Sequence, residues 1–290
     1  MAVSKPASLT LPAPAKVNGF LHVTGRRSDG YHTLESLLVP IDRCDWITLS
    51  CRDGREILRT RGARDIPPDD DLAVRAARLL QSRCGVERGV AIEVDKRIPV
   101  GGGLGGGSSD AATVLLGLNR LWCLELSRRE LLSLAVELGA DVPFFVFGEP
   151  AFASGIGEAL ERFSVPPTWF VVLTPRISVS TAAIFAAPEL TRHTPSAKMR
   201  AFSEAYGGND LQAVAVSRFP EVSTCLDVLA REASSDVKVA MSGSGSSVFA
   251  AFADEKAAAQ TLSRAQRAGK FTAFVARALD RHPLQHFATP

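Results

Sequence analysis

The most unusual stretch of this sequence is a run of six glycines within seven residues, from Gly101 to Gly107, followed by Ser108 and Ser109. Glycine lets the backbone adopt positive φ and lets a ligand approach without a Cβ in the way. An apolar segment with helical spacing comes next, so the run precedes a helix N-terminus, where free amides and the helix dipole favour phosphate. The pattern predicts a phosphate site, to which the serine hydroxyls could add hydrogen bonds or a ligand to Mg²⁺.

Two other nucleotide-binding motifs fit this run less well. The P-loop pattern needs a lysine directly after its glycines, and none follows here. Gly101, Gly103 and Gly106 match the dinucleotide-binding fingerprint, and Glu125 lies 19 residues further on. However, a segment containing Pro99 separates the loop from its strand, and Glu125 lies between two helical patterns instead of ending a strand. A dehydrogenase is the weaker alternative.

A second loop rich in glycine and serine contains Gly243, Ser244 and Gly245 and lies between two short apolar segments. Taken alone, it fits a simple turn as well as a binding loop. Two such loops in one chain favour a ligand that is held from both sides, with amides close to its phosphates.

One carboxylate and one ammonium are candidates for chemistry. Asp141 follows Gly139 and precedes Pro143 in an apolar context, where it either caps a turn or faces a substrate hydroxyl. Phosphoryl transfer needs a positioned nucleophile and stabilised phosphate charge more than covalent chemistry. Lys16 is a lone cation in an apolar segment. It is either a solvated strand residue or a partner of Asp141, which depends on their proximity in the fold.

Apolar periodicity predicts the elements that position these groups. Strands are expected within residues 9–49 on either side of a turn at 28–30, and at 90–94, 169–173, 248–252 and 271–276. The polar stretch 52–71 is expected to be a short strand plus loop, and the apolar segment 237–240 leads into the second Gly/Ser loop. Helices are expected at 72–84, 113–121, 126–138, 181–185, 209–216, 219–233 and 255–268. Strands followed by helices in both halves predict two α+β layers. Pro166 and Pro167 mark the expected boundary, giving domains 1–165 and 166–290.

Composition excludes several classes of protein. A net charge of +2 over 290 residues, without a concentrated basic face, argues against a nucleic-acid binder. The five cysteines form no C-x-x-C pair, which fits neither a disulfide framework nor a zinc site and indicates the reducing cytoplasm. We also expect no secretory leader and no membrane association, because the N-terminus lacks an apolar core and no apolar stretch is long enough to span a bilayer.

Three segments in this order resemble the galactokinase, homoserine kinase, mevalonate kinase and phosphomevalonate kinase (GHMP) superfamily: residues 14–18, 99–112 and 241–247. Residues 24–32, 138–145 and 180–185 are similar to a branch whose substrate carries a cytidine diphosphate group. The resemblance spans about residues 11–286. It implies an α+β fold of two domains, an N-terminal ATP-binding domain with a left-handed βαβ unit and a C-terminal ferredoxin-like domain that completes the substrate cleft.

The resemblance also implies an activity. It is the ATP-dependent phosphorylation of the 2-hydroxyl of a 2-C-methyl-D-erythritol that carries cytidine diphosphate, in the non-mevalonate route to isoprenoid precursors. ATP would be the co-substrate, Mg²⁺ would accompany it, and the enzyme would be a monomer or homodimer. Two alternatives stay open. One is a superfamily kinase for another alcohol, such as mevalonate or homoserine, and the other is a nucleotide-binding regulator without turnover.

Roles for matching residues follow from the same resemblance. Asp141 would be the base or orienting carboxylate, with Lys16 beside it and Asn18 fixing the substrate. Tyr31 and Phe185 would stack on the cytosine ring while His32 bonds its polar edge, with Thr181 nearby; stacking recognises a flat ring and edge contacts decide which base it is. The ATP-binding set would be Lys96, near the adenine, with Pro99, Val100, Gly101, Gly102, Gly103, Leu104, Gly105, Gly106, Gly107, Ser108 and Ser109.

The sequence departs from the usual superfamily pattern at three places. Asp71 stands where an asparagine is usual on the adenine side, Gly19 replaces a leucine, and Ser247 replaces a cysteine or another small residue. An acidic group at position 71 is expected to change a polar contact to the nucleotide. None of the three departures affects the residues expected to perform the chemistry.

Overall fold

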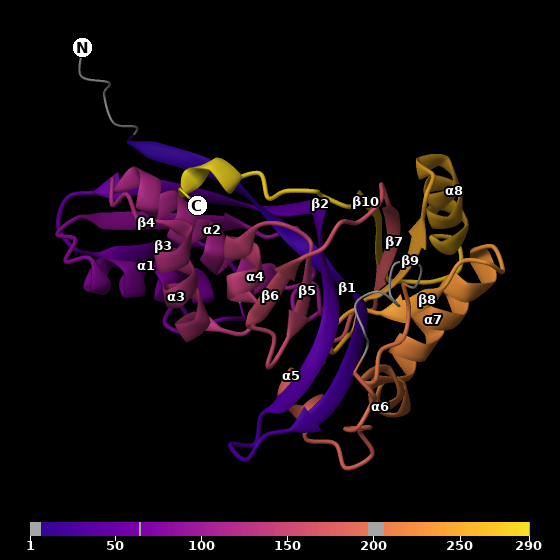
Figure 1. The fold of residues 1–290 in the computed structure, drawn as a ribbon. Helices are drawn as coiled ribbons and strands as arrows, with labels where there is room; N and C mark the ends of the chain where they lie inside the picture. Colours follow the sequence, from indigo (N-terminus) through magenta and orange to yellow (C-terminus); the bar gives the residue numbers. More distant parts are fainter. Residues whose placement is uncertain (1–6, 64, 197–205, 290) are drawn as a thin grey trace.

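The first of two β-sheets carries most of the N-terminal half of the chain (Figure 1). The structure, a computed structural model, describes residues 7–63, 65–196 and 206–289. The strands of this sheet are β1 (Ser8–Arg26), β2 (His32–Arg52), β3 (Ile57–Arg61), β4 (Gly89–Asp95), β5 (Ala151–Ser154) and β6 (Ala159–Arg162). They are ordered β3-β4-β2-β5-β6, with β1 also paired to β2. The strands β3 and β4 are parallel and are connected by a helix, which makes them a βαβ unit.

Four helices pack with this sheet around the first hydrophobic core. They are α1 (Leu72–Arg83), α2 (Gly106–Leu121), α3 (Arg128–Leu138) and α4 (Val142–Phe147). The side chain of Asp71 caps α1 by accepting from the Ala73 amide. Ser127 and Glu130 form a capping box at the start of α3, as the Ser-x-x-Glu spacing indicates.

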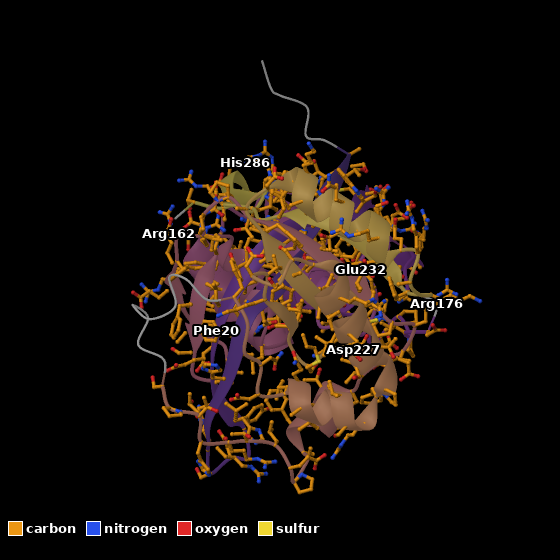
Figure 2. The ribbon with its side chains drawn as sticks, turned by 90° about the vertical axis from the view of Figure 1, so that its right-hand side faces the viewer. Phe20, Arg162, Arg176, Asp227, Glu232 and His286 are labelled. Atoms are coloured by element: carbon orange, nitrogen blue, oxygen red, sulfur yellow. The ribbon has the colours of Figure 1, made fainter. Side chains whose placement is uncertain are left out.

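The second sheet has a ferredoxin-like arrangement. Its strands are β7 (Trp169–Thr174), β8 (Val239–Met241), β9 (Val248–Phe252) and β10 (Thr272–Arg277), ordered β10-β7-β9-β8 and antiparallel throughout. The helices of this half are α5 (Thr181–Phe185), α6 (Gln212–Arg218), α7 (Pro220–Glu232) and α8 (Glu255–Ala265). With α7 and α8 as connecting helices, the chain order is βαββαβ. Figure 2 faces this helical side, with Asp227 and Glu232 labelled on α7. The expected α+β class with a ferredoxin-like second half is confirmed.

The long hairpin of β1 and β2 connects the two sheets (Figure 1). The Leu21 amide donates to the Gly208 carbonyl at 3.0 Å, and the Leu279 amide donates to the Pro40 carbonyl at 2.8 Å. A third apolar cluster contains Phe20 of the hairpin together with Phe170 and Phe249 of the second sheet. Both sheets therefore hold the hairpin in place.

The last described segment, with η2 (Gln285–Phe287), returns from β10 to the helices of the first half (Figure 1). The Arg128 amide donates to the Thr289 carbonyl at 2.7 Å, and the His282 amide donates to the Gly148 carbonyl at 2.7 Å. The chain therefore contributes to the first half at both of its described ends. A division at residues 165 and 166 stays a prediction.

Two parts of the sequence-based assignment differ from the structure. The helix expected at 113–121 begins seven residues earlier, at Gly106, because the last glycines and both serines form its first turns. The helix α4 and the strands β5 and β6 were not predicted, since segments of four to six residues are too short to show a period. Among the described residues, no helix combines the length and apolar character needed to cross a bilayer.

Candidate active site

A cleft of about 930 Å³ opens where the hairpin, the glycine-rich loop and the second half of the chain meet. The walls contain every site residue predicted from the sequence except Ser109. The predicted residues that line it are Lys16, Asn18, Tyr31, His32, Lys96, Pro99, Val100, Gly101, Gly102, Gly103, Leu104, Gly105, Gly106, Gly107, Ser108, Asp141, Thr181, Phe185, Gly243, Ser244 and Gly245. Segments more than 200 residues apart in the sequence thus share one cavity, which has room for a nucleotide and a second substrate.

The glycine-rich loop has a backbone that only glycine adopts easily. Gly101, Gly103 and Gly105 have φ of 69°, 72° and 71°. A Cβ at Gly103 would lie 2.2 Å from the Ser242 carbonyl oxygen, so this position also has no space for a side chain. Gly105 is the N-cap of α2 and supplies no side-chain cap, which leaves the first amides of this helix to a ligand.

Hydrogen bonds join this loop to two other segments. The Lys16 amide of β1 donates to the Leu104 carbonyl at 3.0 Å. From the second Gly/Ser loop, the Ser247 amide donates to the Gly102 carbonyl at 3.1 Å and the Ser242 hydroxyl donates to the Gly103 carbonyl at 3.1 Å. The second loop is therefore a wall that supports the first and not an isolated turn.

The two serines after the glycines differ in their surroundings. Ser108 lines the cleft. Ser109 is completely buried, its amide donates to the Gly105 carbonyl at 2.9 Å, and its hydroxyl is away from the cleft wall. The structure does not bring Ser109 to the nucleotide side, because residues one apart on a helix point in directions about 100° apart.

Lys16 and Asp141 lie together, as the kinase interpretation requires. The Lys16 ammonium is 3.7 Å from an Asp141 carboxylate oxygen. The Lys16 side chain is 4% exposed and that of Asp141 is 42% exposed, so the ammonium lies beneath a carboxylate that faces the cleft. Lys16 also donates to the Asn18 side-chain oxygen, and the Asn18 amide group donates to the Ser36 hydroxyl at 2.8 Å. These bonds give the ammonium a fixed position.

The local fold leaves the Asp141 carboxylate available. Asp141 is the N-cap of α4, but its side chain makes no capping hydrogen bond. Pro143 occupies the first turn of α4, where its missing N–H costs nothing. Five of the six residues of α4 are buried, which anchors the backbone beside Asp141. The alternative that Asp141 only caps a turn is therefore not supported by the geometry.

Lys96 is bound by two carboxylates that the sequence did not single out. The ammonium donates to Asp45 and, at 2.7 Å, to Asp110. Burial by itself lowers the pKa of Lys96, but the two carboxylates outweigh burial and the net shift is upward. Burial raises the pKa of Asp110 to about 7 in spite of Lys96. Asp110 directly follows the loop serines, and this position was the one signal for its role.

Asp71, the departure on the adenine side, lines the cleft but has partners within the protein. One carboxylate oxygen accepts from the Ala73 amide at 2.9 Å, and the other is 2.7 Å from the Arg59 guanidinium. Both side chains of this ion pair are nearly buried. The Asp71 carboxylate therefore caps α1 and pairs with Arg59, and it is not an unpaired charge against the nucleotide.

Aromatic side chains gather at the opposite end of the cleft. Tyr31 is 62% exposed. The His32 ring stacks on Phe185 with centroids 5.2 Å apart and an angle of 29° between the planes. Thr181 and Ser244 share a hydrogen bond of 2.7 Å between their hydroxyls. The stacking of Tyr31 and Phe185 on a base stays a prediction.

One residue of this end, Arg192, had no signal in the sequence. Its guanidinium donates from Nε to His32 Nε2 at 3.1 Å. Burial, followed by the charges of Arg192 and Arg26, lowers the pKa of His32. A single arginine in an irregular segment has no periodicity, and its contact with His32 exists only in the folded chain.

Comparison with known proteins identifies the class. The family models described as "GHMP kinases N terminal domain" and "GHMP kinases C terminal" match residues 71–149 and 186–270. A homoserine kinase from Cytophaga hutchinsonii has the same fold, with a TM-score of 0.67 at 16% identity over 97% of this chain and 98% of that one.

Similar proteins narrow the class further. A "4-diphosphocytidyl-2-C-methyl-D-erythritol kinase" from Thiobacillus denitrificans is 54% identical, covering 97% of this chain and 99% of its own length. One from Nitrosospira multiformis is 50% identical, covering 99% and 96%. A crystal structure of 4-(cytidine 5′-diphospho)-2C-methyl-D-erythritol kinase matches with a TM-score of 0.79 at 35% identity, covering 93% and 99%. The chain belongs to the 4-diphosphocytidyl-2-C-methyl-D-erythritol kinase family of GHMP kinases.

Proposed function

We propose that this chain transfers the γ-phosphoryl group of ATP to the 2-hydroxyl of 4-diphosphocytidyl-2-C-methyl-D-erythritol, with Asp141 and Lys16 at the reacting hydroxyl. The observation that carries these roles is the 3.7 Å pair of a half-exposed carboxylate and a buried ammonium on the wall of the cleft that the glycine-rich loop also lines. Full-length similarity to kinases of that name supports the substrate.

The chemistry assigned to the pair is proton transfer and charge stabilisation. The substrate hydroxyl loses its proton to the Asp141 carboxylate as its oxygen forms a bond to the γ-phosphorus. The bond between that phosphorus and the bridging oxygen of ADP breaks, and ADP leaves. Lys16 lies beside the carboxylate, 3.7 Å away, and neutralises charge on the transferred group. Asn18, which accepts from Lys16, keeps the ammonium aimed at this place.

The backbone of the glycine-rich loop and the N-terminus of α2 are assigned to the triphosphate. Amides that no side chain caps, at the positive end of a helix of 16 residues, suit an anion. Lys96 lines the cleft with its ammonium already held by Asp45 and Asp110. The charge of Lys96 is therefore neutralised within the protein, and we assign its side chain to the wall of the cleft beside the nucleotide.

The aromatic end is assigned to the cytidine group. Tyr31 and Phe185 supply flat faces, His32 an edge contact, and Thr181 a hydroxyl on the same wall. This division lets stacking hold any base while the edge contact selects one. Asn18 would contact the alcohol near the reacting hydroxyl.

Mg²⁺ fits this cleft as a companion of ATP. In the described part of the chain no three carboxylate, histidine or cysteine side chains form a metal cluster. Mg²⁺ commonly binds substrate phosphates, several waters and only one or two protein oxygens. The Ser108 hydroxyl lines the cleft and would hold it together with the phosphates. The ion would supply charge neutralisation at the phosphates.

Three further properties belong to the same proposal. The enzyme would work in the cytoplasm, to which its five free cysteines are suited. It would act on its small-molecule substrates without nucleic acid, in keeping with a net charge of +2. It would be a monomer or a homodimer.

Coupled measurement of ADP release tests the function. The alcohols are 4-diphosphocytidyl-2-C-methyl-D-erythritol, mevalonate and homoserine, with ATP alone as the blank. We expect turnover with the cytidine substrate, and none above the blank with the other two. Turnover that prefers mevalonate or homoserine would contradict the substrate. ATP binding without ADP release from any alcohol would instead point to a regulator.

A further inference from the structure

Arg192 is held in one orientation by the backbone of the segment after α5. Its Nη2 donates to the Ala187 carbonyl at 2.6 Å and to the Phe185 carbonyl at 3.3 Å. Its Nη1 donates to the Leu190 carbonyl at 3.0 Å and to the Pro188 carbonyl at 3.4 Å. With both ends of the guanidinium fixed, the remaining Nε–H points at His32 Nε2, 3.1 Å away.

This contact determines which nitrogen of His32 carries hydrogen. A guanidinium donates hydrogen bonds, accepts none and stays protonated. His32 Nε2 must therefore present its lone pair to Arg192. A neutral imidazole has one N–H, which places the hydrogen on Nδ1. The lone pair on Nε2 that this bond requires belongs to the neutral ring, and burial together with the positive charges of Arg192 and Arg26 shifts the pKa of His32 downward, in the same direction.

The position of the His32 ring leaves its other nitrogen, Nδ1, for a ligand. His32 stacks on Phe185, so its plane is fixed, and both residues line the cleft. Among the described residues, Nδ1 has no hydrogen-bond partner within the protein. A flat ligand at this end therefore meets a fixed donor on the imidazole edge.

We propose that Arg192 is a positioning residue that holds His32 in the Nδ1–H tautomer and thereby makes this end of the cleft select cytosine over uracil. The inference rests on the proposed function for the identity of the bound group. Cytosine N3 is an acceptor and can pair with Nδ1–H, whereas uracil N3 carries a hydrogen and opposes it. A donor facing a donor leaves both groups unsatisfied.

The tautomer itself is measured without substrate. Protein labelled with ¹⁵N-histidine gives two-bond ¹H–¹⁵N correlations whose pattern distinguishes Nδ1–H from Nε2–H. His32 is assigned among the five histidines by the signal lost in His32→Gln. We expect the Nδ1–H pattern in the unaltered protein and conversion toward Nε2–H in Arg192→Met. An Nε2–H pattern in the unaltered protein would overturn the inference.

Base selectivity is measured with the cytidine substrate and its uridine analogue. We expect Arg192→Met to reduce the ratio of their kcat/KM values on the order of 10-fold to 100-fold, as for a lost edge contact. The KM for ATP should stay unchanged. Arg192→Lys, which keeps one donor for Nε2, should retain most of the ratio.

A matched variant separates this role from anchoring of the loop. Arg218 also holds this region, through Glu189 after α5 at 2.7 Å and the Ala183 carbonyl within α5 at 3.2 Å, and among the described residues its hydrogen bonds do not include His32. Arg218→Met should keep the ratio of the unaltered protein. Equal loss of selectivity in both variants, or no loss in Arg192→Met, would overturn the inference. Absence of turnover with the cytidine substrate in the unaltered protein would refute the proposed function, while the tautomer experiment would still test Arg192.

Discussion

The two ends of the cleft are built differently. One end, called here the phosphate end, is the glycine-rich loop, where the main contacts are made by backbone atoms. The carbonyls of Gly102, Gly103 and Leu104 accept hydrogen bonds from two other segments. The other end, called here the base end, is the aromatic end that contains Tyr31, His32 and Phe185. Its contacts are made by side chains, with His32 between Phe185 and Arg192. In the proposed function the backbone cradle would bind the triphosphate, and the side chains at the other end would select the second substrate.

Substituting Asp141 should have the largest effect, because the proposed proton transfer takes place at this carboxylate. We expect Asp141→Asn to lower kcat by about 10²-fold to 10⁴-fold, the usual contribution of a positioned general base. The KM for ATP should change little, because the loop contacts remain. Asp227→Asn, on the exposed face of α7 in Figure 2, is the control and should leave kcat and the KM for ATP unchanged. Near-normal kcat for Asp141→Asn would remove this residue from the mechanism.

The backbone character of the phosphate end can be tested at two glycines. Gly103 has φ of 72°, and a Cβ there would lie 2.2 Å from the Ser242 carbonyl oxygen. Gly103→Ala should lower the free energy of unfolding by about 1–3 kcal/mol and raise the KM for ATP, because the loop must move. A Cβ at Gly107 would meet its nearest atom at 3.7 Å, so Gly107→Ala should be tolerated. Urea unfolding and ATP titration provide the measurements, and equal behaviour of the two variants would count against a rigid cradle.

The side-chain character of the base end can be tested at His32. His32→Ala would remove the proposed edge contact with the base and would leave the glycine-rich loop intact. We expect the KM for the cytidine substrate to rise about tenfold, as for one lost hydrogen bond, with the KM for ATP unchanged. His193→Ala, an exposed histidine outside the cleft, is the control. Equal rises in both KM values for His32→Ala would argue against a role confined to the base.

Asp110 lies outside the proposed chemistry, and its effect should appear in the pH dependence of the free energy of unfolding. Its pKa is raised from 3.8 to about 7, first by burial. Between these two pH values the folded protein binds more protons at this group than the unfolded chain does. The contribution of Asp110 to stability is therefore complete below about pH 4 and is lost as the pH rises through 7.

Urea unfolding between pH 4.5 and 7.5 checks this sign. The free energy of unfolding should fall less steeply with rising pH in Asp110→Asn than in the unaltered protein. The difference between the slopes should be at most about 1.4 kcal/mol per pH unit, the limit for one proton. Asp69→Asn, whose side chain is 80% exposed, should keep the original slope. If the free energy of unfolding depends on pH in the same way in Asp110→Asn and in the unaltered protein, the raised pKa of Asp110 is refuted.

The glycine-rich loop at the start of α2 could be predicted from the sequence because its signal is local. Six glycines before an apolar helix indicate an anion site by themselves, although the helix begins inside the run, at Gly106. The pairing of Lys16 with Asp141 needed the family resemblance, because no local pattern relates residues 125 positions apart. The hydrogen bonds between the two Gly/Ser loops also had no local signal in the sequence, because they form only in the folded chain.

The base end could be predicted only in part. The resemblance named Tyr31, His32, Thr181 and Phe185, but it did not indicate that His32 stacks on Phe185 or that Arg192 donates to it. The carbonyls that hold Arg192 belong to irregular backbone, which has no period. Asp45 was missed for a related reason, since a charged residue inside a strand gives no sign that it faces Lys96.

The most direct test of the central claim is a crystal structure of the chain with the cytidine substrate and a non-hydrolysable ATP analogue. We expect the 2-hydroxyl within about 2.6–3.2 Å of an Asp141 carboxylate oxygen, the reach of a general base. The γ-phosphate should lie between this hydroxyl and the amides of the glycine-rich loop. A hydroxyl bound elsewhere, with Asp141 turned toward solvent and Lys16 on no phosphate, would contradict it.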